Sequence, residues 1–342
     1  MGVFVFIMAI LPLMGGSSMN LMKAESPGPS VSKLVPHVKD TAKILYGIYI
    51  AITICEATIL RALGMPLFDS LTTTFGTVGT GGFGIKNDSI ASYSPAIQIT
   101  ITVFMILSGI NYTAYFYILT GKLKDFFKIE EVRWYLAIIL GSVGIITWNI
   151  RSFYPTLGDT VRHAFFQVGS IITTTGYATT DFNTWPEISR TILVLLMFIG
   201  ACAGSTGGGI KVSRILILCK TVRKELHIFL HPNAVKKIKM DGKAIPHEVV
   251  RSTNIFFIVY MLIFASSIFL IAFDDFNLIT NFTAVAATFN NIGPGLELVG
   301  PTGNFGMFSW FSKLILTFDM LAGRLEIFPL LILFVRDTWK KF

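Results

Sequence analysis

The stretch FGTVGTGGFG, residues 75–84, places five glycines within ten residues of a very apolar chain. Gly79, Gly81 and Gly84 spell G-x-G-x-x-G, the spacing with which a Gly-rich turn cradles the phosphates of a dinucleotide. That turn requires a strand before it and a helix after it, whereas here a threonine-rich amphipathic segment precedes and the polar loop IKNDS follows. We therefore interpret these glycines as serving a function other than dinucleotide binding.

A second glycine-rich stretch, GSTGGGIK at residues 204–211, resembles a phosphate-binding P-loop. In a P-loop the lysine follows glycine directly, but Ile210 stands between the last glycine and Lys211. Neither glycine motif therefore predicts a nucleotide site.

The composition predicts an all-α polytopic membrane protein. Of 342 residues, 53% are hydrophobic and 14% are charged, against about 25% charged residues in soluble domains. A helix needs about 20 apolar residues to cross the hydrocarbon core. About seven spans are predicted from the apolar stretches, which lie near 1–22, 42–63, 96–119, 132–153, 187–222, 247–273 and 308–335.

The net charge of +8 is distributed in a way that indicates a lipid bilayer and argues against nucleic acid. Most lysines and arginines fall in four clusters, which by the positive-inside rule are cytoplasmic. The intervening connections are then expected to cross outward and return. The basic clusters are residues 23–43, 122–133, 211–251 and 336–341.

Each outward connection holds a short, partly apolar segment that ends in a glycine motif: FDSLTTTFGTVGTGGF, DTVRHAFFQVGSIITTTGY and LITNFTAVAATFNNIGPG. Segments of about 10–14 residues are too short to span a bilayer and suit re-entrant helices. Non-helical backbone at membrane depth is tolerated where protein buries it or where it lines a water-filled cavity. Three copies in matching positions therefore predict three loops around one cavity, although one such loop alone could be a simple glycine-rich turn.

The chemistry available to such loops is cation selectivity. Backbone carbonyl oxygens can replace the hydration shell of an ion, while a short helix directs the negative end of its dipole toward the same place. Aligning the ends of the three segments sets Gly82 beside Gly176 and Gly293. These glycines allow the unusual dihedral angles that such a loop requires.

Seven motifs together give the chain a specific resemblance to the Trk/Ktr/HKT superfamily of potassium transporters, and within it to the bacterial Trk-type pore subunits. The motifs cover essentially the whole chain: AESPGP (24–29), GGF (81–83), FFQVGSIITTTGY (165–177), GACAGSTGGGIKVSRI (200–215), HPNAV (231–235), NNIGPG (290–295) and GRLEIF (323–328).

The resemblance implies four helix–pore helix–helix repeats around one central pore, with passive potassium uptake through a carbonyl-lined selectivity filter. Potassium is then the transported substrate, and no covalent cofactor is expected. The expected filter residues, which hold the ion through their backbone carbonyls, are Thr80, Gly81, Gly82, Thr174, Thr175, Gly176, Asn291, Ile292 and Gly293.

The apolar stretch 187–222 is interrupted at residues 200–209, where seven of ten residues are Gly, Ser or Thr. Glycine costs about 1 kcal/mol relative to alanine inside a helix, so a break is expected. A packing kink would explain the break, whereas the resemblance implies an intramembrane gating loop that acts with Arg324. For Arg324 the alternative is a salt bridge with Glu326 or Asp319. The expected gating residues of the loop are Gly200, Gly204, Ser205, Thr206, Gly207, Gly208 and Gly209.

The repeat spacing predicts three complete repeats plus the end of a fourth. The aligned filter glycines are 94 and 117 residues apart (176 − 82 and 293 − 176), so a preceding copy would lie before Met1. We expect a truncated product or a late start, and no normal pore from this polypeptide alone. The predicted units are 1–30 (closing helix of an incomplete first repeat), 31–130, 131–245 (with the gating loop and a basic linker) and 246–342.

The resemblance also implies a homodimer in the bacterial inner membrane and a cytosolic partner, a ring of nucleotide-binding RCK domains. The basic linker 223–243 could contact that ring or could be a solvated loop. A sodium-permeable or sodium/proton-coupled symporter remains an alternative, because the filter position that influences sodium tolerance in this family belongs to the first repeat. An intramembrane enzyme is a third hypothesis, but no acid–base or metal constellation can be assembled from the sequence.

Overall fold

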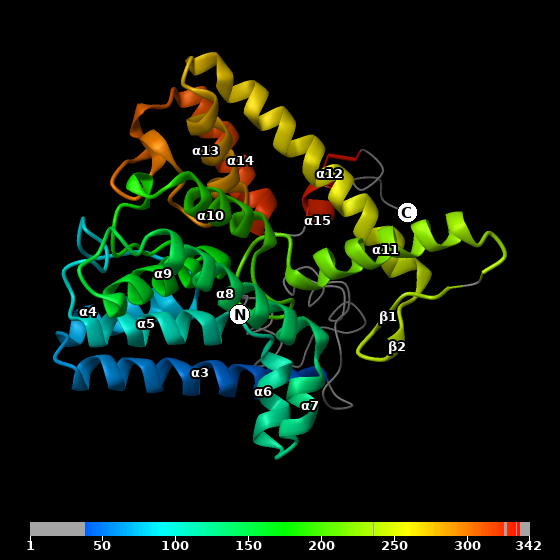
Figure 1. Cartoon of the computed structure of the whole chain (residues 1–342), viewed down its shortest axis with the longest axis horizontal. Helices are drawn as coiled ribbons and strands as arrows, with labels where there is room; N and C mark the ends of the chain where they lie inside the picture. Colours follow the sequence, from blue (N-terminus) through cyan, green and yellow to red (C-terminus); the bar gives the residue numbers. More distant parts are fainter. Residues whose placement is uncertain (1–37, 235, 325–326, 333, 336–342) are drawn as a thin grey trace.

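The computed structural model describes residues 38–234, 236–324, 327–332 and 334–335 (Figure 1). It is helical almost throughout, which confirms the predicted fold class. The segment 1–30, predicted to close a first repeat, lies outside the described residues.

One arrangement occurs three times along the chain: a long helix, a short helix with a loop, and a second helix. The first copy is α3 (Val38–Ala62), α4 (Leu67–Val78) and α5 (Pro95–Ser108). The second is α8 (Glu130–Asn149), α9 (Leu157–Ile172) and α10 (Glu187–Ile199). The third is α12 (His247–Ile271), α13 (Leu278–Phe289) and α14 (Trp310–Arg324).

The short helices α4, α9 and α13 connect the copies to one another. Each packs against the two long helices of its own copy. In addition, α9 packs against α5, and α13 packs against α10, so the closing helix of one copy supports the short helix of the next. In Figure 1, α10 accordingly lies between α8 and α9 on one side and α13 on the other.

The remaining elements connect the three copies. The hairpin of β1 and β2 was not predicted; its strands pair antiparallel, and it projects beside α11 away from the short helices (Figure 1). The connecting elements are α6 (Tyr112–Leu119), α7 (Leu123–Lys128), η1 (Phe182–Thr184), α11 (Val212–Leu230), β1 (Lys239–Met240), β2 (Lys243–Ala244), η2 (Ala272–Asp274), η3 (Glu297–Val299), η4 (Phe305–Met307) and α15 (Ile327–Ile332).

Three helices of the described part are long and apolar enough to cross a membrane, at Lys43–Ala62, Glu130–Asn149 and His247–Asp274. A fourth span is possible if α5 and α6 count as one, but the two helices meet at 96°. The apolar stretch 96–119, predicted as one span, is therefore broken. The predicted span 187–222 is also divided, into α10 and α11.

The core is largest around the second and third copies, and a smaller cluster joins the first copy to the second. That smaller cluster brings Phe166 of α9 and Tyr177, which follows α9, against α3, α5 and their loops. Its members are Leu60, Met65, Ile90, Ile97, Ile101, Met105, Phe166 and Tyr177.

Candidate functional site

The starts of the short helices are fixed by local sequence. Thr156 caps α9 by accepting a hydrogen bond from the amide of Asp159 at 3.1 Å, and Asn277 caps α13 by accepting one from Thr280 at 2.7 Å. Such caps satisfy amides that have no partner inside the helix. Pro66 precedes α4, where a missing N–H is tolerated.

All three short helices end in the same backbone motif, a Schellman motif. Thr80, Thr174 and Asn291 occupy the left-handed region, with φ of 50°, 58° and 56°. In each case the next amide bonds the carbonyl five residues earlier, at 2.8 Å after α4, 2.9 Å after α9 and 2.8 Å after α13. This pattern satisfies the last helix carbonyls and turns the chain out of the helix. The three loops after the helices, which we call the first (79–84), second (173–178) and third (290–295) filter loops, therefore begin alike.

Two glycines place the filter loops against one another. Gly82 has φ +66° and Gly176 has φ +88°, a region that L side chains rarely adopt. A Cβ on Gly82 would overlap the carbonyl oxygen of Thr175, and a Cβ on Gly176 would overlap that of Ile292. The first loop thus lies directly on the second, and the second on the third, as only glycine permits.

In the nine expected filter residues, most backbone amides are hydrogen-bonded, whereas the backbone carbonyls are not. Eight of their amides bond back onto the preceding short helix, as in the bond from Gly82 N to Gly76 O at 3.1 Å. None of their nine carbonyl oxygens accepts a hydrogen bond from another described residue. Buried or partly buried carbonyls are normally paired, so this set of free acceptors indicates a site for a cation or water.

Among the described residues, the edges of the first and third filter loops are exposed. Within the described residues, nothing lies within 4 Å of a Cβ added to Gly293, in contrast to the crowded Gly82 and Gly176. Gly81 and Gly293 are exposed, whereas Thr174 and Thr175 of the second loop are buried completely. The second loop is therefore the middle one, and the first and third loops each have one free edge.

Residues 200–209 form a non-helical loop between α10 and α11 that contacts all three filter loops. The hydroxyl of Thr80 donates to the carbonyl of Thr206 at 2.8 Å, and the amide of Gly208 donates to the hydroxyl of Thr174 at 2.5 Å. A Cβ on Gly208 would meet the carbonyl oxygen of Asn290 at 2.6 Å. The loop therefore covers the end of the filter loops at which the short helices stop.

The same loop explains why α5 and α6 are separate helices. The amide of Cys202 donates to the carbonyl of Gly109 at 3.0 Å, and the amide of Tyr112 donates to the carbonyl of Gly204 at 3.1 Å. These bonds satisfy backbone groups that the break leaves without helical partners. The bend is thus a consequence of a contact between residues about ninety positions apart, which hydropathy could not show.

Arg324, the last residue of α14, reaches the loop 200–209. Its Nη1 donates to the carbonyl of Thr206 at 3.2 Å, the same oxygen that accepts from Thr80. Asp319, considered as its salt-bridge partner, instead accepts a hydrogen bond from Ser267 at 2.7 Å. Glu326 lies outside the described residues. Lys211 also donates to the loop, at the carbonyl of Gly207.

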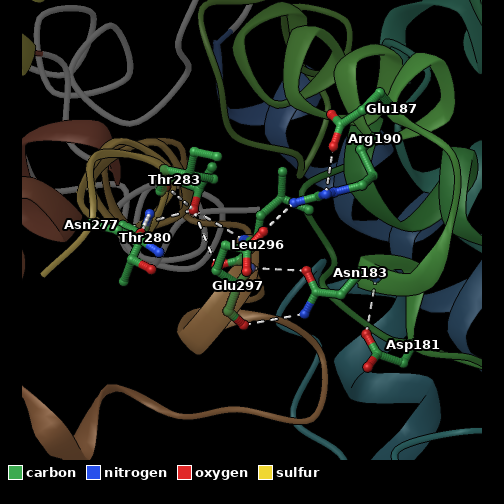
Figure 2. A network of polar contacts seen from close by, with 10 residues as sticks. Asp181, Asn183, Glu187, Arg190, Asn277, Thr280, Thr283, Leu296 and Glu297 are labelled. Carbon is green, nitrogen blue, oxygen red and sulfur yellow. Dashed lines mark hydrogen bonds and ion pairs between the residues drawn. The ribbon is translucent and has the colours of Figure 1, made fainter.

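A polar network joins the second and third copies through residues that follow their filter loops, as Figure 2 shows. The side-chain amide of Asn183 bonds both backbone groups of Glu297, accepting at 2.9 Å and donating at 3.2 Å. Arg190 lies between Glu187 and Glu297, at 2.7 Å and 2.5 Å (Figure 2). The segment that continues the third filter loop is therefore held to the segment that continues the second.

Comparison with known proteins identifies the family. The family described as TrkH, cation transport protein, matches residues 1–341. The chain belongs to the TrkH family. It is similar to the Trk system potassium uptake protein TrkH of Salmonella typhimurium and to that of Escherichia coli K12, each 40% identical over 349 residues, which cover 100% of this chain and 71% of the relative.

A solved structure shares the fold. The crystal structure of the potassium transporter TrkH from Vibrio parahaemolyticus aligns with a TM-score of 0.84 at 34% identity, covering 98% of this chain and 70% of that one. These TrkH relatives are named as transporters and as parts of a Trk system. Together with the apolar helices, they make this TrkH family member a multi-pass membrane protein.

Sequence reasoning missed Glu131, which accepts hydrogen bonds from the amide of Ala203 in the loop 200–209 and from the amide of Ser213 at the start of α11. A glutamate in the first turn of a helix is ordinary, because it complements the helix dipole. The informative property is burial, because Glu131 is only 4% exposed. In the sequence, the neighbouring Glu130 offers the same signal, so the two carboxylates could not be told apart there.

Proposed function

We propose that this protein takes up potassium across the bacterial inner membrane through a filter made by the three filter loops. The observation that carries the proposal is the set of nine carbonyl oxygens without a hydrogen-bond donor among the described residues, at the ends of three equivalent helices. Carbonyl oxygens in such rings replace the water around a dehydrated cation. The names of the relatives supply the identity of the ion.

The short helices assist by their orientation. Each filter loop follows the C-terminal end of its helix, where the partial charge of the helix dipole is negative. Three such ends directed at one place favour a cation there. In this proposal the backbone itself provides the ligands of the ion.

The loop 200–209 is proposed to be the gate. It bonds the first and second filter loops directly and packs against the third, and Arg324 places a positive charge on the same side. A loop that fills the exit and a cation that repels potassium both oppose conduction until the loop moves. The packing-kink alternative predicts no change in flux when the loop is altered.

The proposed partners are a second copy of the chain and a cytosolic ring of RCK domains. The linker at the far end of α11 concentrates positive charge, and the charge of Lys236 is the main cause that lowers the pKa of His227 from its ordinary value. Such a surface suits an acidic partner protein. By the positive-inside rule, this basic linker is expected on the cytoplasmic side of the membrane.

The test is ion uptake by a bacterium that lacks its own potassium uptake systems. The filter loops have exposed edges within the described residues. The chain is therefore expressed both alone and preceded by a further helix and pore helix, which with the closing helix predicted in residues 1–30 would make a first repeat; we call this longer form the extended chain. We expect the extended chain to restore growth at low potassium and to take up rubidium, a potassium analogue, faster than sodium. Equal entry of sodium would favour the sodium-permeable alternative, and no uptake of either ion would contradict the proposal.

A further inference from the structure

Glu131 holds the two flanks of the gating loop with a single oxygen atom. Its Oε1 accepts a hydrogen bond from the amide of Ala203 at 2.7 Å and another from the amide of Ser213 at 3.0 Å. Ala203 lies in the first half of the loop, and Ser213 lies in the first turn of α11, just beyond the loop. The residues between these two amides include most of the proposed gate.

The position of this carboxylate is costly unless its bonds are kept. Glu131 is only 4% exposed, and burying an ionised group is unfavourable without charged or hydrogen-bonding partners. Its partners here are the two amides, the N-terminal end of α11 and the positive charge of Lys211, which itself donates to Gly207 within the loop. Releasing the loop from Glu131 therefore removes the bond from Ala203 and leaves a buried carboxylate with fewer donors.

The neighbouring residue shows that this contact is specific. Glu130 is directed elsewhere: its Oε2 accepts from Lys220 of α11 at 2.6 Å, and its amide donates to Asp241 of the hairpin at 2.7 Å. Glu130 therefore has the same charge and lies in the same helical turn as Glu131, but it makes no hydrogen bond to the loop 200–209 within the described residues. It provides a matched control.

We propose that Glu131 is a positioning residue that clamps the gating loop in the conformation seen here, and that loss of the clamp lets the loop leave the filter. This inference rests on the proposed function only in calling the loop a gate. The clamp itself concerns the loop's position, which can be measured without ion transport.

Cys202 provides that measurement, because it lies in the loop beside Ala203 and is completely buried. The other two cysteines, Cys55 and Cys219, are exposed and free, and each is replaced by serine. The rate at which a maleimide labels Cys202 in the purified 342-residue chain, read by mass spectrometry, then reports how often the loop opens. The variants are Glu131→Ala, Glu131→Gln and the control Glu130→Gln.

We expect Glu131→Ala to accelerate labelling about tenfold or more, which corresponds to about 1.4 kcal/mol, because it removes two hydrogen bonds to a charged group. Glu131→Gln keeps an acceptor oxygen of the same reach without the charge, so a smaller acceleration is expected, and it serves if the alanine variant fails to fold. Glu130→Gln should label at the parental rate. Unchanged labelling in the folded Glu131→Gln and Glu131→Ala variants, or equal acceleration by Glu130→Gln, overturns the clamp.

Rubidium uptake by the same variants in the extended chain separates the clamp from the gate. Faster labelling with higher uptake supports both. Faster labelling with unchanged uptake supports the clamp and contradicts the proposed role of the loop as a gate.

Discussion

At the scale of single residues, Gly176 shows how the filter depends on a missing side chain. It combines a left-handed φ of +88° with a close neighbour, the carbonyl oxygen of Ile292, which a Cβ on Gly176 would overlap. An L residue in this region costs about 1–2 kcal/mol before any overlap is counted. Only a glycine lets the second and third loops lie this close together.

We therefore predict that Gly176→Ala lowers rubidium uptake by the extended chain at least about tenfold. The added Cβ would push the carbonyl of Ile292 away, and even a displacement of less than about 1 Å would disturb that carbonyl as a proposed ion ligand. The control is Gly144→Ala in α8, where a Cβ meets nothing within 4 Å and alanine favours the helix. Uptake in the control should match the parent. Full activity of Gly176→Ala would show that the loops are not held by this contact.

At the scale of elements, the loop 200–209 acts as a connector between α5, α6 and the filter loops. Deleting Gly207 and Gly208 removes the bond from Gly208 to Thr174 and draws the loop away from the filter. We predict higher potassium flux through the extended chain, measured as initial rubidium uptake. Unchanged flux would indicate that the break at this loop serves helix packing and that the loop is not a gate.

The network of Figure 2 predicts an effect on the segments that continue the second and third filter loops. Asn183→Ala removes both bonds to the backbone of Glu297, which lies four residues after Gly293. We expect a loss of about 1 kcal/mol in stability, because the bonds are partly exposed, together with a lower ratio of rubidium to sodium uptake. Asn304→Ala, which removes only a local bond to Gly306, is the control and should keep the ratio. An unchanged ratio in Asn183→Ala would limit the network to a stabilising role.

At the scale of the whole molecule, the filter loops have exposed edges within the described residues. Gly81 and Gly293 are exposed, and no described residue beyond the chain neighbours lies within 4 Å of a Cβ built on Gly293. Each unsatisfied backbone group in hydrocarbon costs several kcal/mol, more than the roughly 0.6 kcal/mol of a typical interhelical hydrogen bond. We predict that residues 1–342 expressed alone do not restore growth at low potassium, whereas the extended chain does. Potassium-selective growth with the chain alone would mean that another copy or subunit covers the exposed edges.

The sequence by itself determined the elements whose signals are local. Hydrophobic composition predicted a helical membrane protein, and the glycine spacing predicted three equivalent short segments that end alike. Local contacts explain these elements. The helix caps Thr156 and Asn277 bond amides three residues away, and the glycines of the filter loops act on the backbone next to them. Nearby residues therefore suffice to predict them.

Only the tertiary structure decided which distant groups meet. The break between α5 and α6 depends on Cys202 and Gly204, and the assignment of Arg324 to Thr206 depends on how α14 packs against the loop. Glu130 and Glu131 are identical in type and adjacent in sequence, yet one contacts the hairpin and the other the gating loop. Successive residues on a helix point about 100° apart, so burial and partner follow from the neighbouring elements, which local sequence does not specify.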